Sequence, residues 1–213
     1  MKTILQKGKA AALVAIVLIV SGCAATQQLS SEDRAKFRSA NIASSVEKAP
    51  QVYLMAPSGA NIGLMFGAIG GAVTGASMED SQNTFRDYLD KNGISIENIV
   101  REEVEAELRA SGKLAIVGAA DSTAATIKVA VPQYGFGVTH LLSSNVVPVL
   151  WIKCDMVDGS GKLLWSQNER MLPSIASPMK PTTWEEMRDN PKKIEEEWRT
   201  ASRYLAKKIV ADL

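Results

Sequence analysis

The sequence predicts an α+β domain. We expect a two-layer sandwich, in which a mostly antiparallel sheet of four or five strands carries two long helices on one face, plus a glycine-rich helical segment. β-Forming residues on both sides of Asp158–Gly161 indicate a hairpin. Apolar residues also recur at helical spacing in two segments, which begin at the capping residues Ser95 and Asn190.

The N-terminal stretch is basic and then apolar. Three lysines precede an apolar run of about 11 residues, which is too short to span a bilayer as an uncleaved anchor. The motif Val20-Ser21-Gly22-Cys23 follows it, and the whole pattern resembles the signal peptide and lipobox of a bacterial outer-membrane lipoprotein. The resemblance implies removal of residues 1–22 and fatty acylation of Cys23. Ala24, in place of an aspartate that signals inner-membrane retention, implies an outer-membrane location facing the periplasm.

The residues after the lipobox are rich in serine, alanine, glutamine and charge. Because residues 24–48 lack a sustained apolar face, we expect a lipid anchor and tether over 23–48, with a short helix near Ser31. The periplasmic α+β domain is then expected over 49–213.

A ladder of glycines at every fourth position lies in the uncharged segment 58–78. On a helix this spacing forms a groove into which another backbone can approach closely. Each glycine lowers the stability of a helix by about 0.5–1 kcal/mol relative to alanine, unless close packing compensates for the loss. Limited apolar bulk and the acids at Glu79 and Asp80 disfavour an isolated membrane span. Two readings stay open, an interface with identical helices or another protein, and packing on the chain's own domain. The ladder consists of Gly59, Gly63, Gly67, Gly71 and Gly75.

The next elements follow from local patterns. We expect strands over 51–55, 114–118 and 126–131, a short amphipathic turn over 84–91, and a helix from Ser95 to Gly112. Pro132 disfavours a continued central strand, so 133–145 is expected to be a long loop with exposed apolar side chains. Its candidate contact residues are Tyr134, Phe136, His140 and Leu141.

The C-terminal third holds the hairpin and the last helix. Strands are expected over 146–157 and 162–168, and Cys154 shares the apolar face of the first strand, so it should be buried. After a proline-rich connector, Thr183 and Glu186 form a capping-box pair, and Pro191 begins the final helix.

Catalysis has few candidate residues. The chain has one histidine and two cysteines, so no cluster with metal-ligand spacing exists, and no phosphate-binding loop is present. We therefore expect no enzyme activity, no cofactor and no metal. A net charge of +1 gives no electrostatic case for nucleic acid, and no small-molecule ligand is expected.

Two fainter resemblances concern the folded part. The order of elements around EEVEAELRASGKLAIVG and VDGSGKLLW, over 94–213, resembles the periplasmic α/β modules of curli-secretion-channel-type lipoproteins and of the Tol-system propeller protein. The ladder resembles glycine-zipper outer-membrane lipoproteins, although those usually carry a zipper twice as long. These resemblances imply a fold more than a function.

The expected function is a lipid-anchored, non-enzymatic component of a cell-envelope assembly or export system. Such a component would self-associate or dock on an envelope protein through the glycine ladder. The alternative is a monomeric accessory lipoprotein that binds lipid or regulates a partner enzyme through loop 133–145.

Overall fold

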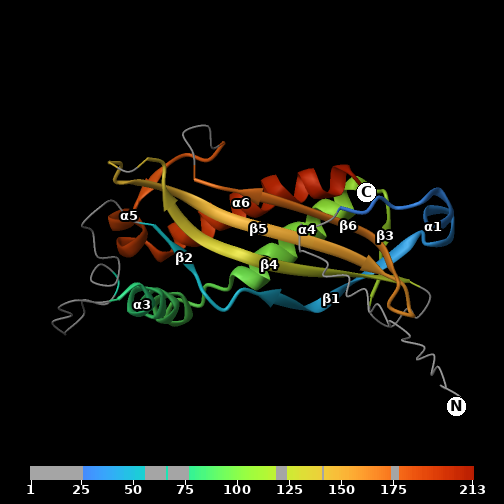
Figure 1. Ribbon diagram of the computed structural model, residues 1–213, viewed down its shortest axis with the longest axis horizontal. Coiled ribbons are helices and arrows are strands. Elements are labelled where there is room, and N and C mark those ends of the chain that lie inside the picture. Colours follow the sequence, from blue (N-terminus) through green and yellow to red (C-terminus); the bar gives the residue numbers. More distant parts are fainter. Residues whose placement is uncertain (1–25, 56–65, 67–76, 119–123, 141, 174–177) are drawn as a thin grey trace, which may run out of the picture.

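The computed structural model describes residues 26–55, 66, 77–118, 124–140, 142–173 and 178–213 (Figure 1). Its strands are β1 (Ser39–Lys48), β2 (Tyr53–Leu54), β3 (Ala115–Ile116), β4 (Ala125–Val138), β5 (Asn145–Val157), β6 (Leu163–Met171) and β7 (Thr182–Thr183). Its helices are α1 (Ser31–Lys36), α3 (Met78–Lys91), α4 (Ile96–Ser111), α5 (Trp184–Asp189) and α6 (Pro191–Ala211). The predicted α+β class is confirmed.

The strands form one sheet with both parallel and antiparallel pairs. Its main path is β3-β1-β4-β5-β6, with β2 also paired to β4 and β7 to β5. β1 runs parallel to β3 and β4, and β2 runs parallel to β4, whereas the pairs of β5 are antiparallel. The seven-stranded sheet is therefore larger and more mixed than the four or five mostly antiparallel strands that the sequence predicts. The two strands that the sequence does not predict are β1 and the two-residue β7, whereas the strands expected over 51–55 and 114–118 are present as the short β2 and β3.

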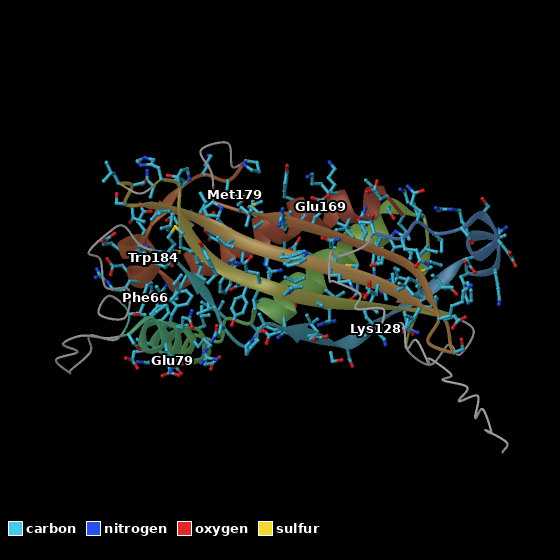
Figure 2. All side chains as sticks on the ribbon, in the orientation of Figure 1. Phe66, Glu79, Lys128, Glu169, Met179 and Trp184 are labelled. Carbon is cyan, nitrogen blue, oxygen red and sulfur yellow. The ribbon has the colours of Figure 1, made fainter. Side chains whose placement is uncertain are left out.

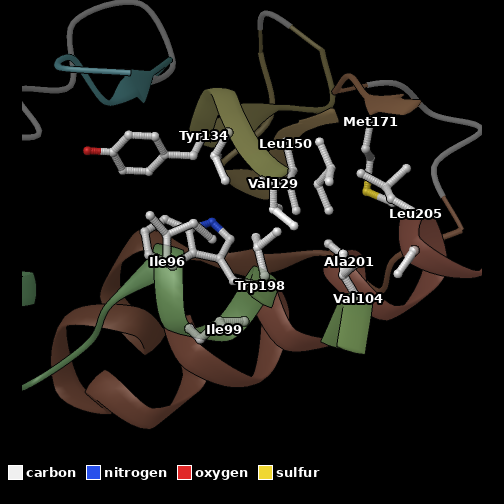
Figure 3. Close-up of a cluster of buried hydrophobic side chains, with 14 of the residues drawn as sticks. Ile96, Ile99, Val104, Val129, Tyr134, Leu150, Met171, Trp198, Ala201 and Leu205 are labelled. Carbon is white, nitrogen blue, oxygen red and sulfur yellow. The ribbon is translucent and has the colours of Figure 1, made fainter. Parts of the chain in front are cut away.

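Two long helices, α4 and α6, pack on one face of the sheet (Figure 1). Their apolar stripes meet the apolar faces of β4 and β5, as the sequence predicts. The close-up in Figure 3 shows this core, with Ile96, Ile99 and Val104 from α4 and Trp198, Ala201 and Leu205 from α6 beside Val129 and Leu150. Each of these side chains is buried, so this helix layer encloses the main core of the described chain.

The predicted ends of α4 and the predicted starts of α5 and α6 are confirmed, except that the side chain of Asn190 makes no capping hydrogen bond at the start of α6. Ser95 caps α4 with its hydroxyl, and Gly112 ends it with a φ of 62°, in the left-handed region. Thr183 and Glu186 form both halves of a capping box at α5, and Pro191 is the first residue of α6.

The segment expected to be a tether is folded into the domain instead. α1 and β1 occupy much of 24–48, and β1 lies between β3 and β4 in the sheet. Only Ala40, Ile42 and Val46 alternate as apolar residues in β1, which is why its sequence resembles a polar linker. The domain begins earlier still, because Gln27 pairs with Ser166 of β6 through two backbone hydrogen bonds of 2.7 and 2.9 Å.

The loop expected over 133–145 is also largely a strand, since β4 continues through Pro132 to Val138. Pro132 is tolerated because it falls in a register shift between Ala130 and Gln133 on the β5 side. On the other side it lies between the residues paired with β1 and those paired with β2. A residue without an N–H group therefore interrupts no ladder hydrogen bond here.

Of the glycine-rich segment 58–78, the structure describes Phe66, Ser77 and Met78. Phe66 is buried, and its ring meets those of Phe85, Tyr88 and Trp184 edge to face at 4.9 to 5.8 Å between centroids. Phe66 and Trp184 lie together at one end of the molecule (Figure 2). Ser77 begins α3 with a capping box, so this helix starts six residues before the amphipathic turn expected at 84–91.

A buried carboxylate joins α4 to α6. Glu103 is 5% exposed and accepts hydrogen bonds from Arg199 and Arg203, at 3.1 and 2.9 Å for the closest pair of atoms. Arg199 also binds Glu102, whose side chain is 49% exposed. The two neighbouring glutamates thus share a partner but differ in burial.

We predict that Glu103→Ala lowers the free energy of unfolding by about 2 kcal/mol, because two arginines lose a buried partner. Glu102→Ala should lower it by less than about 0.5 kcal/mol, because a solvent-exposed ion pair contributes little. Urea unfolding of both variants measures the difference, and equal losses would contradict this account of the α4–α6 contact.

Candidate functional site

The candidate site lies on the sheet face opposite α4 and α6. Along β5 the apolar side chains of Leu150 and Ile152 point to the helices, so Trp151 and Lys153 point the other way. Gln133 of β4 is paired directly with Trp151 and therefore shares its face. Among the described residues, no helix covers this part of the sheet (Figure 1).

Two adjoining hollows on this face, of about 590 and 380 Å³, share the lining residues Ala49, Pro50 and Pro132. We call them together the trough. It lies where the register of β1 shifts between Ile42 and Val46 and where β4 bulges at Pro132. Small side chains there leave a depression between longer ones. The small lining residues are Ala43, Ser45, Ala49, Ala130 and Pro132.

The larger hollow carries charges of both signs. Lys153 Nζ lies 2.6 Å from Asp155 Oδ2, and the hydroxyl of Ser166 donates to Asp155 Oδ1 at 2.6 Å. Lys128 is paired across the sheet with Asp155, and Glu47 lines the hollow on the β1 side. Three lysines and two acids therefore line this hollow. The third lysine, Lys48, is paired with Glu97 on the helix side of the sheet, and the charges of the other four cancel.

The smaller hollow is lined by aromatic and amide side chains and contains no charged residue. Trp151 is half-buried, and its indole Nε1–H donates to Asn168 Oδ1 at 3.2 Å. The lining of the smaller hollow also includes Tyr53 and three glutamines, Gln51, Gln82 and Gln133. This half of the trough offers ring surfaces and amide groups to a ligand.

One wall of the trough depends on a close contact between backbones. Residues 49–53 pass beside β4, and β2 pairs with Gly135 and Phe136 there. Gly135 has a φ of 145°, and a Cβ atom at this position would lie 1.8 Å from the carbonyl oxygen of Tyr53. Only glycine allows β2 to approach so closely.

A third hollow, of about 420 Å³, lies on the helix side, where α3 and the start of α4 meet the end of β1. Lys48 forms a 2.5 Å ion pair with Glu97 and lies 5.6 Å from the centre of the Tyr134 ring. Burial raises the pKa of Tyr134. Burial also acts to raise the pKa of Glu97, but hydrogen bonds and the charge of Lys48 outweigh it and lower that pKa. Lys48 and Glu97 thus bind one another, and Arg86 donates to the carbonyl oxygen of Pro50 and to the side chain of Asn83.

The structure separates the residues predicted to form a contact loop. Tyr134 and Phe136 are core residues of β4, 1% and 0% exposed, so they present no contact surface. His140 is exposed in the turn after β4. Leu141 lies outside the described residues, as do Cys23 and all five glycines of the ladder, Gly59, Gly63, Gly67, Gly71 and Gly75.

Sequence reasoning did not select the trough, although part of it was visible. The alternation Leu150, Trp151, Ile152, Lys153 puts a tryptophan on the polar face of a strand, where it is not needed for the core. Trp165 of β6, by contrast, is buried as a packing residue. The contribution of Tyr53 and the glutamines depends on tertiary pairing and leaves no local signal.

The described residues contain no group of three or more metal-ligating side chains placed to hold an ion. No helix among them is both long and apolar enough to cross a membrane. Cys154 is buried, as predicted, and burial raises the pKa of its thiol to about 12, with a smaller contribution from the charge of Asp155. A thiol with so high a pKa is a poor nucleophile at neutral pH.

We predict that Gly135→Ala destabilises the protein by about 3 kcal/mol or more, because the new methyl group forces β2 away from β4. A Cβ atom at Gly159 would meet no other atom within 4 Å, so Gly159→Ala should change the free energy of unfolding by less than about 0.5 kcal/mol. Denaturant unfolding compares the two variants. A mild effect of Gly135→Ala would contradict the proposed contact.

We also predict that the Cys154 thiol makes the protein less stable at alkaline pH. Between about pH 9 and 12 the unfolded chain releases a proton that the folded chain keeps, so stability falls as pH rises. From pH 8 to pH 10 the free energy of unfolding should fall by about 1.4 kcal/mol more in the wild type than in Cys154→Ala. Urea unfolding at both pH values measures this, and equal falls would show that the thiol is not buried as described.

Comparisons with known proteins give few matches. No protein-family model and no curated protein matches the chain. Among solved structures, the PelC dodecamer from Paraburkholderia phytofirmans in space group P6 is 13% identical, with a TM-score of 0.39, over 89% of this chain and 94% of that one. A variant PelC dodecamer from the same organism, in space group C2, is 11% identical, with a TM-score of 0.40, over 88% and 92%. Likeness at this level carries no information about what this chain binds or assembles with.

Proposed function

We propose that the protein is a lipid-anchored, non-enzymatic component of a cell-envelope assembly or export system. In this proposal Cys23 is acylated in the outer membrane, the domain faces the periplasm, and copies associate, or dock on an envelope protein, through the glycine ladder.

The observation that carries the proposal is the position of Gln27. Its backbone is hydrogen-bonded to Ser166 of β6, only four residues after Cys23. Four residues span at most about 14 Å, so an acylated Cys23 would hold the folded body against the membrane surface. Neighbouring copies would then share one orientation, which favours lateral association because less rotational freedom remains to be lost.

The burial of Phe66 against the chain's own α3 and α5 supports a protein environment over a lipid one for segment 58–78, and it does not by itself favour an interface between copies. Its ring is 8% exposed and is surrounded by aromatic side chains from α3 and α5. A residue in the middle of segment 58–78 that is buried in this way has no need of a bilayer. The alternative role, regulation of a partner through loop 133–145, loses support because Tyr134 and Phe136 belong to the core.

The test is the mass of the acylated protein in mild detergent. We expect a multimer for the wild type and a monomer for the double variant Gly67→Leu with Gly71→Leu, because larger side chains fill the groove of the ladder. The matched control is Gly159→Leu, in the exposed hairpin turn, which should leave the mass unchanged. Circular dichroism checks that each variant is folded.

A monomeric wild type, or a multimer that is unaffected by the double variant, would overturn self-association through the ladder. Cys23→Ser tests the anchor separately, since it should leave an unprocessed precursor. A normally matured product of Cys23→Ser would overturn the proposed location.

A further inference from the structure

The sheet face opposite α4 and α6, which no described helix crosses and which α3 borders through Gln82, has the chemistry of a binding site. The smaller half of the trough gathers Trp151, Tyr53 and three glutamines around a hollow of about 380 Å³. Ligand sites are typically concave, with apolar or aromatic walls and a few polar groups that set orientation. This composition is unusual for an ordinary solvent-exposed sheet face, which carries mainly charged and small polar side chains.

Trp151 is held in a fixed orientation. Its only donor, the indole N–H, is bound to Asn168, so the ring has no other polar group to offer. What the side chain presents to the hollow is therefore apolar ring surface. Such a surface suits the flat C–H face of a sugar ring, which stacks on aromatic side chains.

The three glutamines complement that surface. The side-chain amides of Gln51, Gln82 and Gln133 hydrogen-bond to no other side chain or backbone group among the described residues, although Gln82 and Gln133 are half-buried. Each amide has both a donor and an acceptor, which matches the dual character of a hydroxyl group. An aromatic platform with free amides around it is suited to a ligand rich in hydroxyls.

The charges of the trough favour a neutral ligand. The smaller half has no charged lining residue. In the larger half Lys153 binds Asp155, Lys48 is paired with Glu97 of α4, and Lys128 and Glu47 have opposite signs. A strongly charged ligand would find no net field to attract it.

The dimensions favour a chain over a single sugar. The two halves share Ala49, Pro50 and Pro132, and the distance along β4 from Lys128 to Gln133 is roughly 17 Å, at about 3.3 Å per residue. A peptide strand is a poorer fit, because the backbone groups of β4 and β5 beneath the trough are largely paired with each other and cannot accept an added strand.

We infer that the trough binds a neutral glycan chain, with one sugar ring stacked on Trp151 and its hydroxyl groups bound by the glutamines. The site is independent of the lipid anchor and of the glycine ladder. The inference therefore stands or falls separately from the proposed assembly role.

The test is isothermal titration of the mature protein in mild detergent with two neutral tetrasaccharides, one of glucose and one of N-acetylglucosamine. We expect at least one to bind with a dissociation constant below about 1 mM, with little change when the salt concentration is raised. The two probes distinguish a plain from an acetylated glycan. No binding of either, or tighter binding of a decaproline peptide, would overturn the inference.

Variants assign the binding to the trough. Trp151→Ala should weaken binding at least ten-fold, whereas Trp151→Phe, which keeps a ring, should stay within about three-fold of the wild type. Gln133→Leu, which removes one amide and keeps the volume, should weaken it about five-fold. The matched control is Tyr204→Ala, an exposed aromatic on α6, which should leave binding unchanged. Full affinity in Trp151→Ala, or an equal loss in Tyr204→Ala, would place the ligand elsewhere.

Discussion

The uninterrupted course of β4 past Pro132 is the constraint on which the rest of the fold depends. β4 is the one described strand that pairs with β1, β2 and β5, so it joins the parallel and antiparallel parts of the sheet. Pro132 cannot donate to a ladder, and the strand continues only because both neighbouring ladders are interrupted at that residue. The interruption costs little, because the missing hydrogen bond would have had no acceptor.

The bulge at Pro132 has opposite consequences on the two faces of the sheet. On the helix side it precedes Tyr134 and Phe136, and the Phe136 ring stacks on Trp198 with 5.3 Å between centroids and 20° between planes. The indole N–H of Trp198 donates to the carbonyl oxygen of Gly135 at 3.2 Å, which ties α6 to the same stretch of β4. On the other face Pro132 itself lines the depression, beside Trp151 and Gln133. Core and trough thus share one structural cause.

Elements with strong local signals were predictable from sequence, and the others were not. α4 carries an apolar stripe and begins at a capping serine, and α6 carries an apolar stripe and begins at a proline. The β5–β6 hairpin has a turn that contains glycine, so the signals for all three are local. The sequence of β1 is typical of a tether, because only three of its ten residues face the core with apolar groups. Its place is set by pairing with β3 and β4, far away in sequence. For the same reason the trough could be only partly anticipated, through the position of Trp151 on a polar strand face.

A lipid anchor at Cys23 and a glycan bound in the trough would have a defined direction relative to each other. Gln27 is paired at the outer edge of β6 beside Ser166, and Lys162 of the nearby hairpin turn lies 3.6 Å from Asp33 of α1. An anchor at Cys23 would therefore hold this end of the sheet at the membrane. Trp151 precedes Asp155, the partner of Ser166, by four residues along β5, or about 13 Å at the rise of a strand. The aromatic half of the trough would then be the half more distant from the membrane, and a glycan bound along it would extend away from the bilayer surface.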